Sequence, residues 1–225
     1  MRTRLSVVIA ATALLSAPLA ASALNIDDFL DDQPLLIGVG PPNPQSVSDT
    51  VPALLGDRTI DLHRTSGFGE ASADANVSEA GVFSFGTGAG TEGNVTLTYS
   101  NFGTADVTDA GDSLFFEFNA RSDLDALVTV SFLSGADVSS ADFLLTGAGT
   151  GDGPFQFHFV ALAALVGTAD LTNVDTITVA ISGPASLDLQ IGLLRTVPVP
   201  VPEPGTLALL GIGLAGLTHA SRRRA

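Results

Sequence analysis

Hydrophobic and polar residues alternate with a period of two along most of the chain. Residues 94–99 are Asn-Val-Thr-Leu-Thr-Tyr, so the apolar side chains fall on one face and the polar side chains on the other. That alternation is typical of a β-strand buried on one face. The same pattern predicts strands at 114–119, 127–132, 155–159, 176–181 and 187–193, and weaker alternation predicts two more at 58–65 and 82–85.

The alternation also divides each strand into an apolar and a polar phase. In 155–159, Phe155, Phe157 and Phe159 share one face, while Gln156 and His158 share the other. His158 is therefore expected in the polar phase of its strand, where an imidazole is solvated or hydrogen-bonded. The only helix-like stretch, 160–166, follows this strand directly and predicts one short helical turn.

Clusters of Gly, Asn, Asp and Ser separate the predicted strands. They lie at 86–93, 101–111, 147–154 and 183–186 and are signals for turns and loops. Short strands rich in valine, threonine and phenylalanine, with no helices between them, favour an antiparallel sandwich over a parallel α/β sheet. We therefore predict an all-β, jelly-roll-like antiparallel β-sandwich, formed by a single domain over residues 24–197.

The N-terminus predicts a secretory signal peptide over residues 1–23. Arg2 and Arg4 supply a positive region, 5–15 is an apolar stretch too short to span a bilayer, and Ala21 and Ala23 form an A-x-A cleavage site. Cleavage after Ala23 would leave Leu24 as the first mature residue. The chain contains no cysteine, which excludes both a lipid-anchored cysteine and disulfides in the exported fold.

Three features follow one another over the C-terminal residues 198–225. They are a rigid Pro202-Glu203-Pro204-Gly205 strip, an apolar stretch of 15 residues at 206–220, and a basic cluster of Arg222, Arg223 and Arg224. The prolines favour an extended, accessible backbone, and arginines next to a membrane span stay on the cytoplasmic side. A buried core helix or a last strand is the alternative for 206–220. Its three glycines would weaken a soluble helix by about 1 kcal/mol each but are tolerated in a membrane.

This arrangement closely resembles the PEP-CTERM sorting signal, in which a Pro-Glu-Pro motif precedes a short transmembrane helix and a basic cluster. The resemblance covers about a tenth of the chain. It implies recognition and cleavage by an exosortase, a membrane-embedded enzyme of exopolysaccharide-producing Gram-negative bacteria. The protein would then pass through the inner membrane with the export machinery and reach the cell surface or the extracellular matrix.

The charge of the chain limits its partners. All nine basic residues are arginine, and five of them lie in the two terminal signals. The remaining four face 24 acidic residues, which gives the mature part a formal charge of −20. Affinity for phosphate backbones comes from lysine and arginine, so nucleic acid is excluded as a partner. Such a charge favours solubility and attracts divalent cations.

No motif in the body predicts catalysis. Ser84 lacks the G-x-S-x-G spacing of a nucleophile elbow, and neither His63 nor His158 has a second ligand at the spacing of a zinc site. Glu117, between two phenylalanines on a strand, is the best candidate for a glycosidase acid, but an ordinary glutamate on the solvent face has the same pattern. Glycoside hydrolysis also needs a second carboxylate nearby. We expect a non-enzymatic protein without a cofactor.

Calcium is the one ion for which the sequence offers ligands. Asp106, Asp109 and Asp112 are bunched in a loop before a strand, and four more aspartates crowd the mature N-terminus at 27–32. Calcium takes oxygen ligands only. Neither group fits an EF-hand loop, and aspartates also occur in loops simply as turn formers. The sequence leaves both interpretations open.

The stretches 170–179 and 185–191 resemble the closing strands of secreted bacterial jelly-roll and carbohydrate-binding sandwiches. No binding residue can be transferred from this resemblance. We predict an exported surface or matrix protein that acts on no substrate, with exopolysaccharide as a candidate partner. The alternatives are a glycan- or calcium-binding module and a secreted glycoside hydrolase. An aromatic strip on an exposed sheet face would favour the module, and two buried neighbouring acids the hydrolase.

Overall fold

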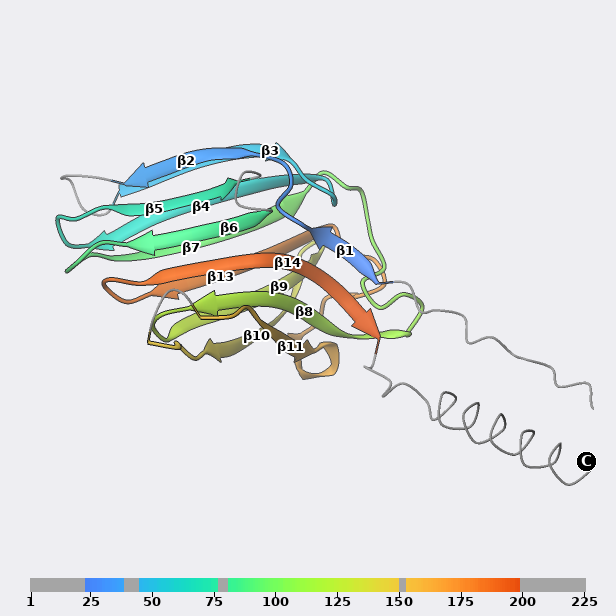
Figure 1. Cartoon of the computed structure of the whole chain (residues 1–225). Coiled ribbons are helices and arrows are strands. Elements are labelled where there is room, and N and C mark those ends of the chain that lie inside the picture. The colour runs from blue at the N-terminus through green and yellow to red at the C-terminus, as the bar shows by residue number, and fades with distance from the viewer. Residues whose placement is uncertain (1–22, 39–44, 77–80, 150–152, 199–225) are drawn as a thin grey trace, which may run out of the picture.

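A computed structural model describes residues 23–38, 45–76, 81–149 and 153–198. Two antiparallel sheets of seven strands each pack face to face (Figure 1). The first sheet contains β1 (Leu24–Asp27), β2 (Gln33–Gly38), β5 (Ala71–Asn76), β6 (Val82–Thr87), β8 (Ser113–Ser122), β11 (Gln156–Ala161) and β14 (Asp188–Pro198). The second contains β3 (Gln45–Pro52), β4 (Asp57–Ser66), β7 (Glu92–Ser100), β9 (Ala126–Ser134), β10 (Asp137–Leu145), β12 (Val166–Gly167) and β13 (Thr176–Gly183).

The strand order places sequence-distant segments side by side. The first sheet runs β11-β8-β14-β6-β5-β2, with β1 also paired to β14, and the second runs β12-β10-β9-β13-β7-β4-β3. The first and last strands of the described sandwich, β1 and β14, are thus neighbours, with Leu24 opposite Thr196. The strands β11 and β10 lie near one end of the sandwich, and β2 and β3 lie at the other (Figure 1).

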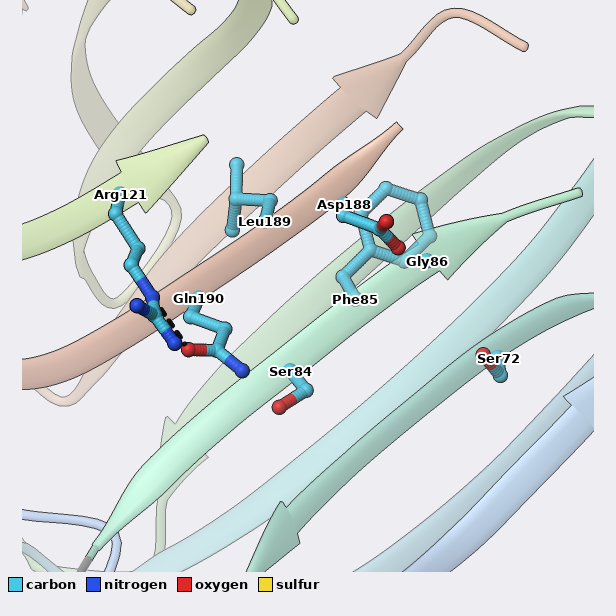
Figure 2. A pocket seen from close by; sticks show the side chains of 8 residues that line it. All are labelled: Ser72, Ser84, Phe85, Gly86, Arg121, Asp188, Leu189 and Gln190. Atoms are coloured by element: carbon cyan, nitrogen blue, oxygen red, sulfur yellow. Dashed lines mark hydrogen bonds between the residues drawn. The ribbon is translucent and has the colours of Figure 1, made fainter. Parts of the chain in front are cut away.

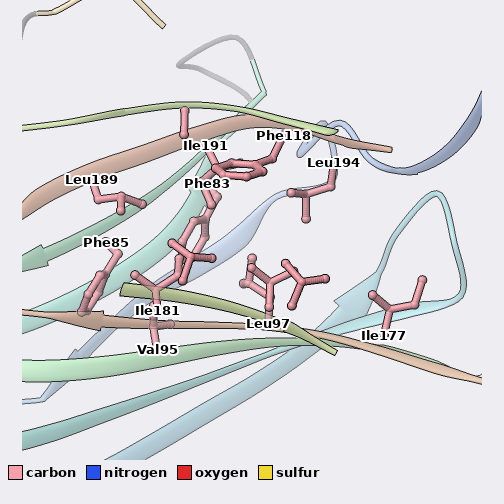
Figure 3. Close-up of a cluster of buried hydrophobic side chains, with 14 of the residues drawn as sticks. Phe83, Phe85, Val95, Leu97, Phe118, Ile177, Ile181, Leu189, Ile191 and Leu194 are labelled. Atoms are coloured by element: carbon pink, nitrogen blue, oxygen red, sulfur yellow. The ribbon is translucent and has the colours of Figure 1, made fainter. Parts of the chain in front are cut away.

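The core fills the space between the sheets. Phe83, Phe118 and Ile191 from the first sheet face Leu97 and Ile181 from the second, and all five are almost completely buried (Figure 3). Burial of an aromatic or branched aliphatic side chain of this size stabilises a fold by about 1.5–3 kcal/mol. Because the chain has no disulfide, this apolar contact is the main source of stability.

A buried polar network fastens the N-terminal segment to the core. Arg58 Nη1 donates to Asp27 Oδ2 at 2.6 Å, and the Tyr99 hydroxyl donates to the same oxygen at 2.8 Å. Arg58 Nε also donates to Gln33 Oε1 at 3.0 Å. Burial raises the pKa of Tyr99 well above its ordinary value, so the phenol stays protonated as a donor. Asp27 is therefore an anchoring residue and not one of several solvated acids at the mature N-terminus.

The prediction of an all-β antiparallel sandwich is confirmed, as is each strand predicted from alternation. The expected helical turn is a 3-10 helix, η2 (Leu162–Ala164). Sequence reasoning missed the strands with weak apolar patterns, which are β1, β2, β3, β5, β10 and β12. Residues 1–22 of the proposed signal peptide (1–23) and the proposed transmembrane helix at 206–220 lie outside the described residues, and both stay predictions. Among the residues that are described, none forms a helix long and apolar enough to cross a membrane.

Candidate functional site

A strip of aromatic side chains lies on the outer face of the first sheet. Phe157 and Phe159 of β11 are 55% and 46% exposed, and Phe155, just before the strand, is half-buried. We call these three residues the aromatic strip. Phe115 of β8 meets Phe159 edge to face, with ring centroids 6.2 Å apart. The alternation in β11 therefore holds, but its large apolar residues point to solvent.

The side of β11 that faces the core carries His158, which the sequence predicted to face solvent. His158 faces Phe118 across the strand pair, and the two rings stack with centroids 4.9 Å apart and planes 18° apart. Val160, on the same side, is buried. The prediction that His158 occupies the polar, solvated phase is thus wrong. At the edge of a sheet, the core side needs fewer large side chains, and an imidazole stacked on phenylalanine covers it.

Acidification is expected to weaken the fold through His158. Burial lowers the pKa of this imidazole from its ordinary value of 6.5. The folded state then binds fewer protons than the unfolded state, so the stabilisation is complete above about pH 6.5 and is lost as the pH falls through the lowered pKa. We expect the unfolding free energy of the wild type to drop between pH 7.5 and 5.5, measured by urea denaturation. In His158→Phe, which keeps the stack but cannot titrate, this drop should be smaller, and an equal drop would contradict the assignment.

Glu117 lies on the outer face beside the aromatic strip, and it is buried. Its register partner on β11 is Phe159, and its Oε1 accepts hydrogen bonds from Arg195 Nε at 2.8 Å and Nη2 at 2.6 Å. Of the two interpretations that the sequence left open for Glu117, an ordinary solvent-exposed glutamate is therefore wrong, because the side chain is buried. Its close partner is a guanidinium and not a second carboxylate.

A pocket of about 280 Å³ opens on the same outer face, next to the aromatic strip. Its polar lining comes from four neighbouring strands: Ser72 of β5, Ser84 of β6, Asp188 and Gln190 of β14, and Arg121 of β8 (Figure 2). Gly86 also lines it, and a Cβ there would come within 3.4 Å of Asp188 Oδ1 and 3.5 Å of Ser72 Oγ. The missing side chain keeps the pocket open.

Arg121 joins the pocket to the aromatic strip. Its Nε donates to Gln190 Oε1 at 2.7 Å, the two residues being register partners on β8 and β14. On its other side the guanidinium lies 5.0 Å from the centroid of the Phe155 ring. The outer face thus combines exposed rings, hydroxyls, an amide, a carboxylate and a guanidinium within one sheet.

The candidate calcium residues lie in the loop before β8. Asp106 Oδ1 accepts from the Thr108 amide at 2.9 Å and from its hydroxyl at 2.6 Å, and Oδ2 accepts from the Ala110 amide at 2.9 Å. These hydrogen bonds lower the pKa of Asp106. Both of its oxygens are thus used as turn formers. Within the described ranges, Asp106, Asp109 and Asp112 are not gathered with one another or with other acids into a group that could hold a metal ion.

The two histidines are far apart in the topology. His63 is on the outer face of β4 near one end of the second sheet, and His158 is on the inner face of β11 at the opposite end of the first. Sequence reasoning missed Arg121, Gln190 and Asp188 as site residues. Each occupies an outward position of a predicted strand, but the pairing of β8 with β14 that brings them together has no signature in the sequence.

Solved structures with a similar arrangement include carbohydrate-binding modules. The family 11 carbohydrate-binding module from Clostridium thermocellum, in complex with a β-1,3-1,4-mixed-linked tetrasaccharide, is 12% identical over 78% of this chain and 95% of its own, with a TM-score of 0.41. An agarase is 12% identical over 81% of this chain and 25% of its own, with a TM-score of 0.48. These values describe a shared sandwich architecture only. No curated protein matches the chain in sequence.

The C-terminal residues have a more specific match. The family model of the PEP-CTERM protein-sorting motif matches residues 200–224, which include Pro202, Glu203, Pro204 and the three terminal arginines. This confirms the resemblance seen in the sequence. The motif implies processing by an exosortase, and with it export and sorting to the surface or the membrane. The chain therefore carries a PEP-CTERM protein-sorting motif at residues 200–224, after a two-sheet β-sandwich.

Proposed function

We propose that this protein is a non-enzymatic component of an exopolysaccharide matrix or cell surface, and that its sandwich binds glycan through the outer face of the first sheet. One observation carries the proposal: Phe157 and Phe159 expose their rings side by side along an edge strand, next to a polar pocket. Large apolar side chains grouped on an exposed face are a sign of a binding surface.

The chemistry of the face suits a sugar polymer. A pyranose ring has apolar C–H faces that can cover a phenyl ring, and hydroxyls around its rim that need hydrogen-bond partners. The aromatic strip supplies the first contact. Ser84, Gln190 and Asp188 in the neighbouring pocket supply donors and acceptors for the second. Because β11 is an edge strand, a long polymer can run past it without meeting a wall.

The contacts of Glu117 support the non-enzymatic part of the proposal. A glycosidase needs one carboxyl group that donates a proton and a second one about 5–9.5 Å away. Glu117 is covered by its neighbours and accepts two hydrogen bonds from Arg195, so its contacts are those of a residue that holds β8 and β14 together. Mature protein incubated with the exopolysaccharide of its producing bacterium should then release no reducing ends.

Replacing both exposed phenylalanines with alanine is expected to weaken binding. About half of each ring is free to contact a ligand, so each should contribute about 1 kcal/mol of apolar contact. Phe157→Ala/Phe159→Ala should thus raise the Kd for the exopolysaccharide tenfold or more. Affinity electrophoresis in gels that contain the polymer measures this, with the mature protein of the producing bacterium.

A matched control is available on another part of the surface. Phe68, in the loop between β4 and β5, is 86% exposed. Phe68→Ala removes the same kind of side chain from a site outside the proposed face, so its Kd should equal that of the wild type. Equal losses in Phe68→Ala and in the double variant would indicate nonspecific adhesion and contradict the proposal.

A further inference from the structure

Arg121 differs from the other three arginines of the sandwich in its electrostatic environment. Arg58 is paired with Asp27, Arg195 is paired with Glu117, and Arg64 is fully buried. Arg121 forms no ion pair with any described residue, although the domain around it is strongly acidic. A guanidinium is always charged and has five N–H donors in a planar fork. Arg121 lines the open pocket on the outer face of the first sheet, so its positive charge faces the space in which a ligand would lie.

The guanidinium is held in place by neutral groups. Gln190 Oε1 accepts from Nε at 2.7 Å, the Gly153 carbonyl accepts from Nη1 at 3.4 Å, and the Phe155 ring packs 5.0 Å away. These contacts fix the plane of the fork, yet they use only part of its donors, and none of them neutralises its charge. Arg121 itself lines the open pocket. Such a preorganised fork is suited to bidentate binding of an anion.

We propose that Arg121 recognises an anionic group on the glycan, so that the ligand is an acidic polysaccharide and not a neutral one. The inference rests on the proposed function, because it names the class of glycan that the same face binds. Two oxygens of a uronic acid carboxylate match the fork, and two oxygens of a sulfate ester share the same chemistry. Neighbouring sugar rings of the chain would then cover Phe157 and Phe159.

The other charges near the pocket permit this contact. Asp188 also lines the pocket, but Figure 2 shows the guanidinium directed toward Gln190 and away from Asp188. Asp188 can accept hydrogen bonds from sugar hydroxyls. Glu117, further along β8, is already paired with Arg195. The repulsion between an acidic domain and an acidic polymer acts at long range and is screened within about 8 Å at physiological salt, whereas the contact with Arg121 is direct.

The test compares one polymer with and without its charge. The probes are the exopolysaccharide of the producing bacterium, the same material after chemical reduction of its carboxyl groups to alcohols, and the same material after desulfation. Mature wild-type protein should bind the native polymer about tenfold or more tightly than the form that lacks the recognised group, as expected for loss of a charge-assisted hydrogen-bonded pair. If reduction of the carboxyl groups lowers the affinity, the recognised group is a carboxylate. If desulfation lowers it, the recognised group is a sulfate ester.

Variants at Arg121 then connect this preference to the side chain. Arg121→Gln should bind the native and the uncharged polymer with equal affinity, close to that of the wild type for the uncharged form. Arg121→Lys, which keeps the charge but loses the planar fork, should keep part of the preference and serves if the glutamine variant does not fold. Phe157→Ala should weaken binding to both polymers by the same factor and leave the preference intact.

Two outcomes separate the inference from the function on which it rests. Equal affinity of the wild type for all three polymers, or an unchanged preference in both Arg121 variants, would overturn the role of Arg121 while glycan binding stands. No binding to any of the three polymers would overturn the proposed function, and the inference with it.

Discussion

Asp27→Ala is expected to lower the free energy of unfolding by about 3–5 kcal/mol. Removal of one partner from a buried ion pair leaves the other charge without compensation, and that cost exceeds the loss of an ordinary contact. Here the guanidinium of Arg58 would stay buried, with only Gln33 Oε1 and the Asp31 carbonyl as acceptors. The Tyr99 hydroxyl and the Phe29 amide would each lose their acceptor as well.

Chemical denaturation of the mature protein, followed by circular dichroism, measures this change. Asp28→Ala is the matched control, because Asp28 is the next residue and, within the part of the chain that the structure describes, its carboxylate accepts only from the exposed Leu30 amide. It should change the unfolding free energy by less than about 1 kcal/mol. Tyr99→Phe removes one hydrogen bond and should fall between the two, at about 1–3 kcal/mol. Equal effects of Asp27→Ala and Asp28→Ala would show that the buried pair adds nothing to the fold.

The central strands could be predicted from the sequence because they are buried on one side along most of their length. Along most of β7 and β13 large apolar residues point inward and polar or small residues point outward, so the period of two is visible; only Gly93 and Gly183 interrupt the apolar inward row. The inward face of β5 carries only Ala71, Ala73 and Ala75, which are buried. Alanine is only weakly hydrophobic, so its alternation with polar residues gives a weak pattern. Close packing at that position requires small side chains, and this removes the signal.

The site was less accessible to sequence reasoning because periodicity does not say which face of a strand meets the core. In β11 the phenylalanines and the polar residues alternate as expected, but the sheet edge places Phe157 and Phe159 outside. The pocket depends in addition on long-range pairing: Arg121 and Gln190 are 69 residues apart. The register between β8 and β14 is set by the packing of the whole sandwich. The sequence therefore shows which residue types are present, but it does not predict that Arg121 and Gln190 lie next to each other.

The topology also brings the two ends of the mature chain together. Leu24, the residue after the predicted signal cleavage site, pairs with Thr196. Only three residues lie between Pro198, at the end of β14, and Pro202, so the Cα atoms of these two prolines can be at most about 14 Å apart. An enzyme embedded in the membrane would therefore cut close to the end of the folded sandwich where β1 meets β14. The pocket lies around Asp188 and Gln190, at the opposite end of β14, whereas Phe159 of the aromatic strip is in register with Glu117, which is in register with Arg195 beside β1.

Replacing Pro202-Glu203-Pro204 with three alanines is expected to block processing completely. The motif precedes the apolar stretch, which we predict to hold the chain in the membrane together with the terminal arginines, so we expect an exosortase to reach the motif only during that stage. The variant should be exported and should then accumulate as a larger, membrane-bound form, detected by cell fractionation and intact mass. Wild-type protein in a host that lacks its exosortase should likewise stay in the membrane, with the mass of its own chain before cleavage at the C-terminal signal.

Two further variants separate recognition from retention. Deletion of 206–225 removes the apolar stretch and the arginines, so the sandwich should be released directly, with or without the exosortase. Substitution of Arg222, Arg223 and Arg224 by serine should weaken retention, because the positive charge that keeps this end inside is lost. If the alanine variant instead showed the mass and location of the processed wild type, the Pro-Glu-Pro strip would be only a rigid linker, and the cleavage signal would have to lie elsewhere in 200–224.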